Sequence, residues 1–97
     1  MAGINRGETA IISIEVRNAA GDLADPATSM TITITNPSGV EVISAVAMSK
    51  ATPPVTGEYH YDYAVAAAAP LGLWAVRLIA TDASRVSIED DKFSVME

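Results

Sequence analysis

The amino-acid sequence predicts a small all-β domain in which two sheets pack face to face. Apolar and polar residues alternate with period two along most of the chain, and turn residues recur at regular intervals. The alanine run at residues 66–69 is the one helix-like segment, and Pro70 ends it before a stable helix could form. We therefore expect a loop there, with at most one helical turn.

Two early segments carry clear strand patterns. Residues 9–17 and residues 28–36 each alternate apolar side chains with Ser, Glu, Arg or Thr, as half-buried strands do. The expected inward positions are Ile12, Ile14 and Val16 in the first strand and Met30, Ile32 and Ile34 in the second. A turn at residues 18–22 and the Asp25-Pro26 pair lie between them.

The third expected strand, residues 40–48, follows a tight Asn36-Pro37-Ser38-Gly39 turn that favours a hairpin. Val40, Val42, Val46 and Met48 share one parity, which Ser44 interrupts. The alternation of this strand is therefore less regular than that of the two strands before it. A loop containing Pro53-Pro54 follows at residues 49–57.

The last strands are predicted at residues 58–65, 72–82 and 86–96. A turn is expected at residues 83–85, and Glu89-Asp90-Asp91 is interpreted as a bulge that could divide the last segment into two strands. The expected inward positions are Tyr59, Tyr61, Tyr63, Val65, Trp74, Val76, Leu78 and Ala80. The fold prediction is an immunoglobulin-like β-sandwich of six or seven antiparallel strands, formed as a single domain by residues 1–97.

Composition limits how stable this domain is alone. The chain has 97 residues, of which 49% are hydrophobic and only 5% aromatic, so its core is thin. It contains no cysteine, which excludes a stabilising disulfide and a thiolate nucleophile or metal ligand. We expect the chain to self-associate or to bind a larger assembly.

The charge balance argues against two classes of partner. Six Lys and Arg residues against twelve Asp and Glu residues give a net charge of -6, which opposes binding to nucleic acid and to anionic membranes. The N-terminal residues lack the apolar core of a signal peptide, and no apolar run reaches the ~20 residues of a membrane helix. We expect a protein made soluble in the cytoplasm.

His60 and Asp62 are the strongest candidates for chemistry, because they share one face of a strand and could form a hydrogen-bonded pair. Hydrolases that use such a pair also need a nucleophile, and no G-x-S-x-G or comparable motif supplies one. We favour an exposed pair on a solvated face. The prediction is that the chain has no catalytic residues and is not an enzyme.

The acidic loops and the tyrosines each allow two interpretations. Asp22, Asp25, Asp82 and the segment Glu89-Asp90-Asp91 could bind Ca²⁺, but no D-x-D-x-D-G loop arranges them, so charged turns are favoured and no metal or cofactor is expected. The row Tyr59, Tyr61, Tyr63 could be a stacking platform for sugars, or core with one hydroxyl tied to the backbone in a tyrosine corner. The scarcity of aromatics favours core.

Several short motifs together support a family resemblance. They are Arg6-Gly7-Glu8-Thr9, Asp25-Pro26-Ala27-Thr28, Asn36-Pro37-Ser38-Gly39, Thr56-Gly57-Glu58-Tyr59, Pro70-Leu71-Gly72-Leu73-Trp74 and Phe93-Ser94-Val95. In this order the chain resembles the small immunoglobulin-like structural proteins of tailed bacteriophages and prophages. The resemblance covers nearly the whole chain and carries over no binding or catalytic residue.

The resemblance implies a non-enzymatic virion protein that decorates or stabilises the capsid by binding the major capsid protein, and it leaves a neck or tail accessory protein open. An immunoglobulin-like module that binds carbohydrate or a cell surface is a further alternative, for which exposed tyrosines would be needed. Loops often carry binding on rigid scaffolds. We expect the docking surface in three loops at one end of the sandwich, at residues 18–25, 50–56 and 66–71.

Overall fold

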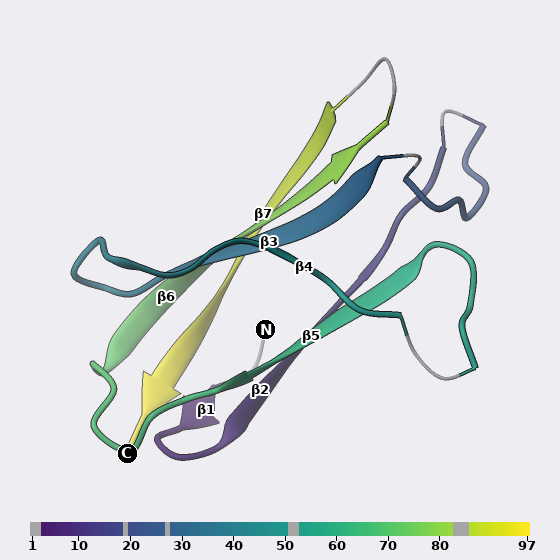
Figure 1. The fold of residues 1–97 in the computed structure, drawn as a ribbon. Coiled ribbons are helices and arrows are strands. Elements are labelled where there is room, and N and C mark those ends of the chain that lie inside the picture. Colours follow the sequence, from purple (N-terminus) through teal and green to yellow (C-terminus); the bar gives the residue numbers. More distant parts are fainter. Residues whose placement is uncertain (1–2, 19, 27, 51–52, 83–85) are drawn as a thin grey trace.

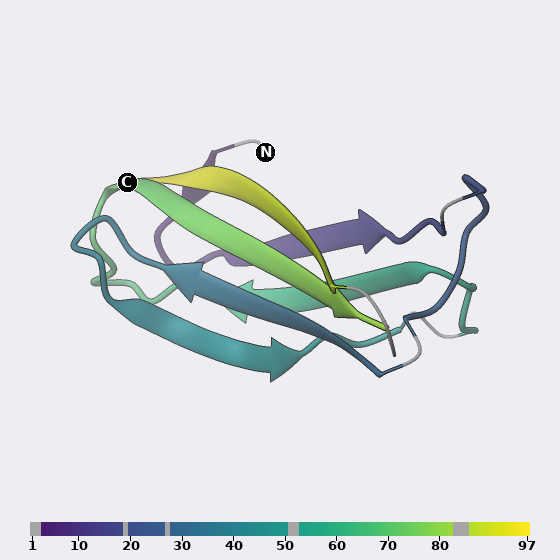
Figure 2. The same cartoon turned by 90° about the horizontal axis from the view of Figure 1, so that it is seen from above.

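The computed structural model describes residues 3–18, 20–26, 28–50, 53–82 and 86–97, which form seven strands and no helix (Figure 1). The strands are β1 (Ile4–Asn5), β2 (Thr9–Glu15), β3 (Ser29–Thr35), β4 (Glu41–Ala47), β5 (Glu58–Ala64), β6 (Gly72–Thr81) and β7 (Val86–Met96). Five of them form one sheet in the order β1-β7-β6-β3-β4, and β2 pairs with β5 in a second sheet. Figure 2 shows the sheets as two layers.

One hydrophobic core lies between the two layers, and the period-two pattern explains its membership. The inward rows of β2, β3 and β6 are buried as expected, while Ile14, Val16 and Ala80 at their ends are half-buried against the same core. The buried apolar residues are Ala10, Ile12, Met30, Ile32, Ile34, Met48, Val65, Ala69, Trp74, Val76, Leu78, Phe93 and Val95. No polar side chain of the described residues is buried.

Trp74 is the centre of this core. It pairs directly with Phe93 across the β6–β7 ladder, and the two rings stack with centroids 5.8 Å apart. Tyr63 packs on it from the opposite sheet at 6.0 Å, so the three aromatic side chains join both layers. The indole Nε1 donates a hydrogen bond to the Pro70 carbonyl at 3.0 Å, which removes the cost of burying its polar group.

The hairpin between β3 and β4 forms as the sequence predicts. The Asn36 side-chain oxygen accepts hydrogen bonds from the Ser38 and Val40 amides, each at 3.0 Å, and so closes the turn. Gly39 has a φ of 86°, a conformation that favours glycine. The predicted loop at residues 66–69 is also confirmed, as a turn closed by the Ala69 amide on the Ala66 carbonyl.

β4 does not bury most of the valine row in its sequence. Val40 and Val42 are exposed, Val46 is 38% exposed although it lies opposite the buried Ile32, and Ile43 packs half-buried against the core. Met48, which shares the parity of the row, is buried. An extra residue lies opposite Thr33 between the pairs Ile32↔Val46 and Ile34↔Ile43, and a second register shift follows. Ala45, which has a φ of 50°, donates its amide to Thr33 Oγ1. These bulges change the parity of an edge strand, which period-two counting cannot anticipate.

The expected bulge at Glu89-Asp90-Asp91 is also wrong. β7 is one continuous strand, paired with β6 in unbroken register from Gly72↔Val95 to Thr81↔Val86. Its polar residues therefore keep strand parity, so Glu89 lies opposite the buried Leu78 and yet is exposed. The turn expected at residues 83–85 lies outside the described residues.

The strands are not all antiparallel, because β1 pairs with β7 in parallel through Ile4↔Val95 and Asn5↔Met96. The chain turns at Gly7, with a φ of 83°, and passes from β1 in the five-stranded sheet to β2 in the other. A two-residue strand is too short to show an alternation pattern, which explains why the sequence did not predict it.

We expect Trp74→Ala to lower the free energy of unfolding by about 3–5 kcal/mol, because it removes the largest core side chain and leaves a cavity between the layers. Leu73→Ala is the matched control, since Leu73 is adjacent on β6 but 53% exposed, and it should change stability by no more than about 0.5 kcal/mol. Urea unfolding of both variants measures the difference. Equal losses would contradict the placement of Trp74 at the centre of the core.

Candidate interaction surface

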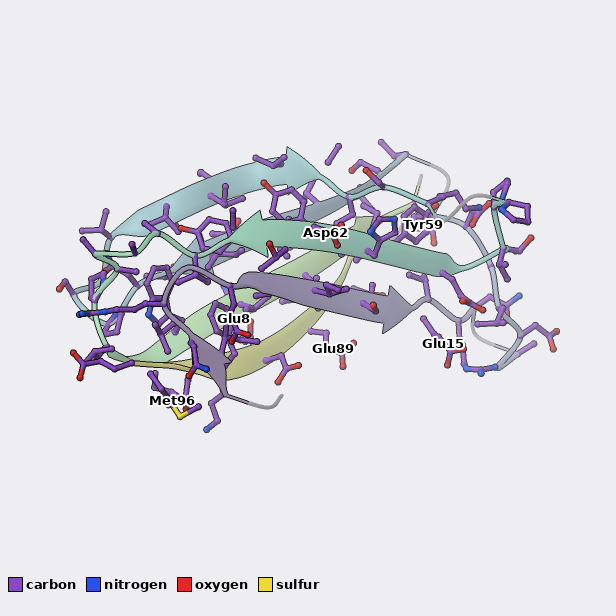
Figure 3. All side chains as sticks on the ribbon, turned by 90° about the horizontal axis from the view of Figure 1, so that it is seen from below. Glu8, Glu15, Tyr59, Asp62, Glu89 and Met96 are labelled. Atoms are coloured by element: carbon purple, nitrogen blue, oxygen red, sulfur yellow. The ribbon has the colours of Figure 1, made fainter. Side chains whose placement is uncertain are left out.

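The two-stranded sheet leaves one side of the protein open. On the β5 side, the chain leaving β4 continues the sheet, because Ser49 and His60 exchange two backbone hydrogen bonds of 2.9 and 2.8 Å. On the β2 side, no strand among the described residues pairs with β2. One long edge of β2 is therefore unpaired, and it lies beside β7 (Figures 2 and 3).

The direction of the unpaired backbone groups follows from the hydrogen bonds that flank the β2–β5 ladder. The Val16 amide donates to the Gly57 carbonyl at 2.7 Å, and the Val65 amide donates to the Glu8 carbonyl at 2.9 Å. Even-numbered β2 residues therefore bond to β5, since bonded and non-bonded pairs alternate in an antiparallel ladder. The backbone N–H and C=O groups of Thr9, Ile11, Ser13 and Glu15 point to the open edge.

The first half of β7 is open on the same side. β1 pairs only with Val95 and Met96, so β7 has no further neighbour there among the described residues. Glu89 and Asp91 occupy core-facing positions opposite Leu78 and Val76, and both are exposed because β2 and β5 do not extend over them. In the sequence, acidic residues at the core-facing positions 89 and 91 indicate that this half of the strand is uncovered. The bulge interpretation missed this signal.

Two adjoining grooves occupy the open side, and both are lined by Ile14, Glu15 and Glu89. The larger, of about 660 Å³, extends over the outer face of the two-stranded sheet to Ile11 and Glu58. The smaller, of about 300 Å³, extends beneath β7. Its other lining residues are Val16, Arg17, Met30, Leu78, Ala80, Ser87 and Ile88. We refer to the β2 edge with both grooves as the open-side surface.

Three carboxylates line the larger groove, those of Glu15, Glu58 and Glu89, and no Lys or Arg lines it. Glu15 lies 3.6 Å from Arg17, whereas Glu58 and Glu89 have no ion-pair partner among the described residues. Figure 3 shows Glu89 on the β7 side of β2 and Glu15 near the end of the strand. The open-side surface therefore combines unpaired backbone groups, exposed apolar side chains and uncompensated negative charge.

His60 and Asp62 form the expected pair on the outer face of β5. Nδ1 of His60 lies 3.4 Å from an Asp62 carboxylate oxygen, and the side chains of His60 and Asp62 are 34% and 54% exposed. The ladder places Ser13 opposite His60, but no hydrogen bond among the described residues joins their side chains. The geometry lacks the bonded nucleophile and base of a hydrolase.

The three tyrosines of β5 are half-buried against the core, as the core interpretation expects. Burial, with a smaller contribution from Tyr61, raises the pKa of the Tyr63 hydroxyl. Among the described residues, no tyrosine hydroxyl bonds a backbone group, so the structure has no tyrosine corner there. A flat, exposed aromatic platform is not formed by this row.

The acidic residues considered for Ca²⁺ do not converge. Asp90 lies on β7 and pairs with Arg77 through two contacts of 2.8 and 3.1 Å, which lower the pKa of Asp90. Asp25 bonds Lys50 instead, and Asp22 is exposed in its turn. The described residues contain no group of three or more His, Asp or Glu side chains placed to hold a metal ion.

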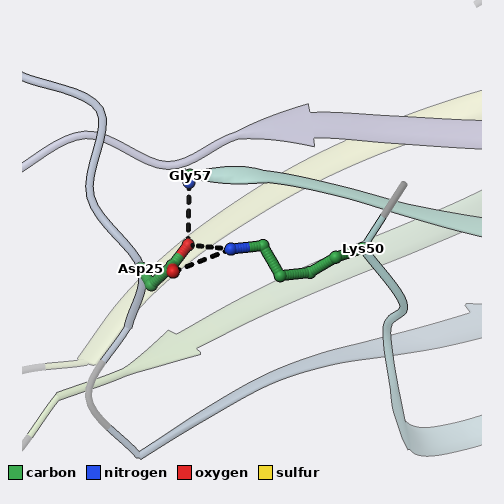
Figure 4. Close-up of polar contacts among 3 residues, drawn as sticks. All are labelled: Asp25, Lys50 and Gly57. Atoms are coloured by element: carbon green, nitrogen blue, oxygen red, sulfur yellow. Dashed lines mark hydrogen bonds and ion pairs between the residues drawn. The ribbon is translucent and has the colours of Figure 1, made fainter. Parts of the chain in front are cut away.

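A polar cluster that the sequence did not predict joins three segments at one end of the protein (Figure 4). Both Asp25 carboxylate oxygens accept from Lys50 Nζ, at 2.8 and 2.7 Å, and one accepts from the Gly57 amide at 2.8 Å. The ammonium lies 5.4 Å from the centroid of the Tyr59 ring. We refer to Asp25, Lys50, Gly57 and Tyr59 as the Asp25 cluster.

The Asp25 cluster fixes the loop end of the molecule. The hydrogen bond from Lys50, followed by that from the Gly57 amide, lowers the pKa of Asp25 below its ordinary value of 3.8. Burial and the nearby Asp25 charge raise the pKa of the Tyr59 hydroxyl. Because Asp25 supplies the acceptor that the Gly57 amide needs, the loop before β3 and the loop before β5 are held together.

The three loops expected at one end do not all lie there. The loops at residues 18–25 and 50–56 meet through the Asp25–Lys50 contact, within the described residues. The loop at residues 66–71 lies at the opposite end, beside the C-terminus (Figure 1), where Arg6 Nε donates to the Ala69 carbonyl at 2.8 Å. β5 runs from one end of the protein to the other. The loop at residues 50–56 precedes β5 and the loop at residues 66–71 follows it, so these two loops lie at opposite ends.

Comparison with protein families, with curated proteins and with solved structures found no match. The described part of the chain also has no helix with the length and apolar character needed to cross a bilayer.

We expect Gly57→Ala to destabilise the protein more than Gly39→Ala. Both glycines have positive φ, which costs a non-glycine residue about 1–2 kcal/mol. A Cβ at Gly57 would also lie 2.7 Å from the Val16 carbonyl oxygen and 3.0 Å from the Ala24 amide nitrogen, whereas a Cβ at Gly39 meets nothing within 4 Å. Thermal unfolding of both variants measures this, and an equal or smaller effect at Gly57 would contradict the close backbone packing there.

We expect Asp25→Asn to lower the unfolding temperature at neutral pH and to reduce the loss of stability in acid. The folded-state pKa of Asp25 is depressed, so its contribution is fully present above its ordinary value of 3.8 and is lost as the pH falls below that value. The difference between the two proteins should therefore shrink below about pH 4. Asp22→Asn, in an exposed turn, is the control. A constant difference at all pH values would count against the ionised cluster.

Proposed function

We propose that this chain is a non-enzymatic structural module that acts by binding another protein, and that its fold is of the immunoglobulin-like type. One observation carries the functional part: the open-side surface presents unpaired backbone groups of β2 beside two grooves. Unpaired strand edges are templates for protein association.

The strand order supports the immunoglobulin-like proposal. In such domains the second and fifth strands of the seven-strand set share one sheet, while the third, sixth and seventh form the other. Here β2 and β5 share one sheet, and β7, β6, β3 and β4 are neighbours in the other. The chain departs from antibody constant domains in placing β1 and β4 in the larger sheet and not beside β2 and β5. It also has no cysteine and carries its core tryptophan on β6.

For the assembly, we propose a tailed-phage virion, in which the chain decorates or stabilises the capsid. The support is the family resemblance of the sequence and the acidic surface, which favours a protein partner over nucleic acid. A neck or tail accessory role fits the same features. A carbohydrate-binding role is less well supported, because Tyr59, Tyr61 and Tyr63 face the core.

Quantitative mass spectrometry of purified phage particles from the strain that encodes the chain tests this proposal. A copy number comparable to that of the major capsid protein is expected for a head decoration protein, and a few copies per particle would indicate the neck or tail. Absence from purified particles, with the chain present in the same lysate, would overturn the virion proposal.

A further inference from the structure

We propose that the unpaired edge of β2 binds an extended segment of a partner protein as an added strand, and that this segment carries apolar and basic side chains at alternate positions. The inference rests on the proposed protein-binding function and names its site and the chemistry of its ligand. Three properties of the open-side surface lead to it.

The first property is the backbone of β2. Its seven residues pair with β5 in regular register without a bulge, so Thr9, Ile11, Ser13 and Glu15 offer an uninterrupted row of backbone donors and acceptors. An added strand gains affinity from main-chain hydrogen bonds of this kind. The edge of β4 is a poorer template, because its register shifts and Ala45 at positive φ interrupt the ladder.

The second property is the apolar lining that an added strand would cover. Ile14 of β2 and Val16, which directly follows the strand, are half-buried, and the smaller groove continues from them to Met30 and Leu78 of the five-stranded sheet. On the outer face Ile11 is 63% exposed. Alternate side chains of an added strand point to opposite faces, so its inward positions would be apolar and would extend the thin core.

The third property is charge. Glu15, Glu58 and Glu89 line the larger groove without a Lys or Arg, and Glu58 and Glu89 have no ion-pair partner among the described residues. This groove reaches Ser13 and Glu15 on the outer face of β2, so its negative charge would attract Lys or Arg at the outward positions of an added strand. A second copy of this chain is the less suitable occupant, because it would bring the same acidic groove and a further net charge of -6.

The test uses a blocked synthetic peptide of the same seven-residue length as β2, in which lysine alternates with valine. We expect the peptide to shift the NMR signals of the Ile11, Ser13 and Glu15 amides more than those of Ile12 and Ile14, and to bind more weakly as salt is raised. A matched peptide with glutamate in place of lysine should not bind. Equal binding of the two peptides, or no binding of the lysine peptide, would overturn the proposal.

Two proline variants locate the added strand. The Ser13 amide points to the open edge, so Ser13→Pro removes no hydrogen bond within the protein but should weaken peptide binding at least about tenfold. Val86→Pro makes the corresponding change at the first residue of β7, which lines neither groove, and should leave the affinity unchanged. NMR spectra of the free variants verify that each is folded. If Val86→Pro abolishes binding and Ser13→Pro does not, the assignment to β2 is wrong.

Charge reversal tests the recognition element separately. The double substitution Glu58→Lys and Glu89→Lys should weaken the lysine peptide about tenfold and allow the glutamate peptide to bind, because both carboxylates are exposed or half-exposed and unpaired within the described residues. The matched control is Glu41→Lys, on the distant strand β4. Unchanged peptide preference in the double variant would contradict the charge argument.

Sedimentation of the free protein and binding to particles separate this inference from the proposed function. If Ser13→Pro converts a dimer into a monomer, a second copy occupies the edge and the inference fails. If the chain is found in particles and Ser13→Pro is incorporated as well as the natural sequence, the virion role stands and the β2 edge is not its docking site. If the natural sequence is incorporated into particles and the Ser13→Pro variant is not, the result supports both the virion role and docking through the β2 edge.

Discussion

A sheet of two strands has to cover the inner face of a sheet of five, and most of the structure follows from this constraint. Two strands placed centrally can bury the middle of the larger sheet, where Trp74 lies with Phe93 and Tyr63 around it. They cannot also cover both margins. The chain closes one margin itself, because Ser49, which follows β4, forms backbone hydrogen bonds with His60 on β5. The margin between β2 and β7 is left open among the described residues.

The amino acids along β7 show how the protein adapts to this margin. Phe93 and Val95 lie under the covered half and are buried, whereas Glu89 and Asp91 occupy the same face in the uncovered half and stay in water. Charged residues at inward positions of an open margin keep strands of other copies from pairing there. The same carboxylates underlie the proposal that the open-side surface binds a basic ligand.

Strands that pair in an unbroken register could be predicted from the sequence. The bulged strand β4 and the two-residue strand β1 could not. Period two placed Ile12 in β2, Ile32 and Ile34 in β3 and Val76 in β6, because each of these strands keeps its parity from end to end. It failed in β4, where a bulge at Ala45 reverses the parity, and it did not reveal the two-residue β1. The Asp25 cluster was also missed, since residues 25, 50 and 57 meet only through tertiary folding.

The candidate site was harder to predict than the fold, because an unpaired strand edge leaves no mark in the sequence. Loops do have sequence signatures. The loops at residues 18–25 and 66–71 were therefore expected to act together, although they lie at opposite ends of the protein. An unpaired edge has no such signature. The pattern of β2 is the same whether one or two neighbours flank it, and only the sheet order shows that its second neighbour is missing among the described residues.

Amide hydrogen exchange along β2, followed by NMR at a concentration where the protein is monomeric, tests this account most directly. The amides of Ala10, Ile12 and Ile14 bond to β5 and should exchange slowly, while those of Ile11 and Ser13 point to the open edge and should exchange rapidly. This alternation would establish a two-stranded cover with one free edge. Slow exchange at Ile11 and Ser13 as well would show that another segment pairs with β2, and would contradict the open margin from which the functional proposals derive.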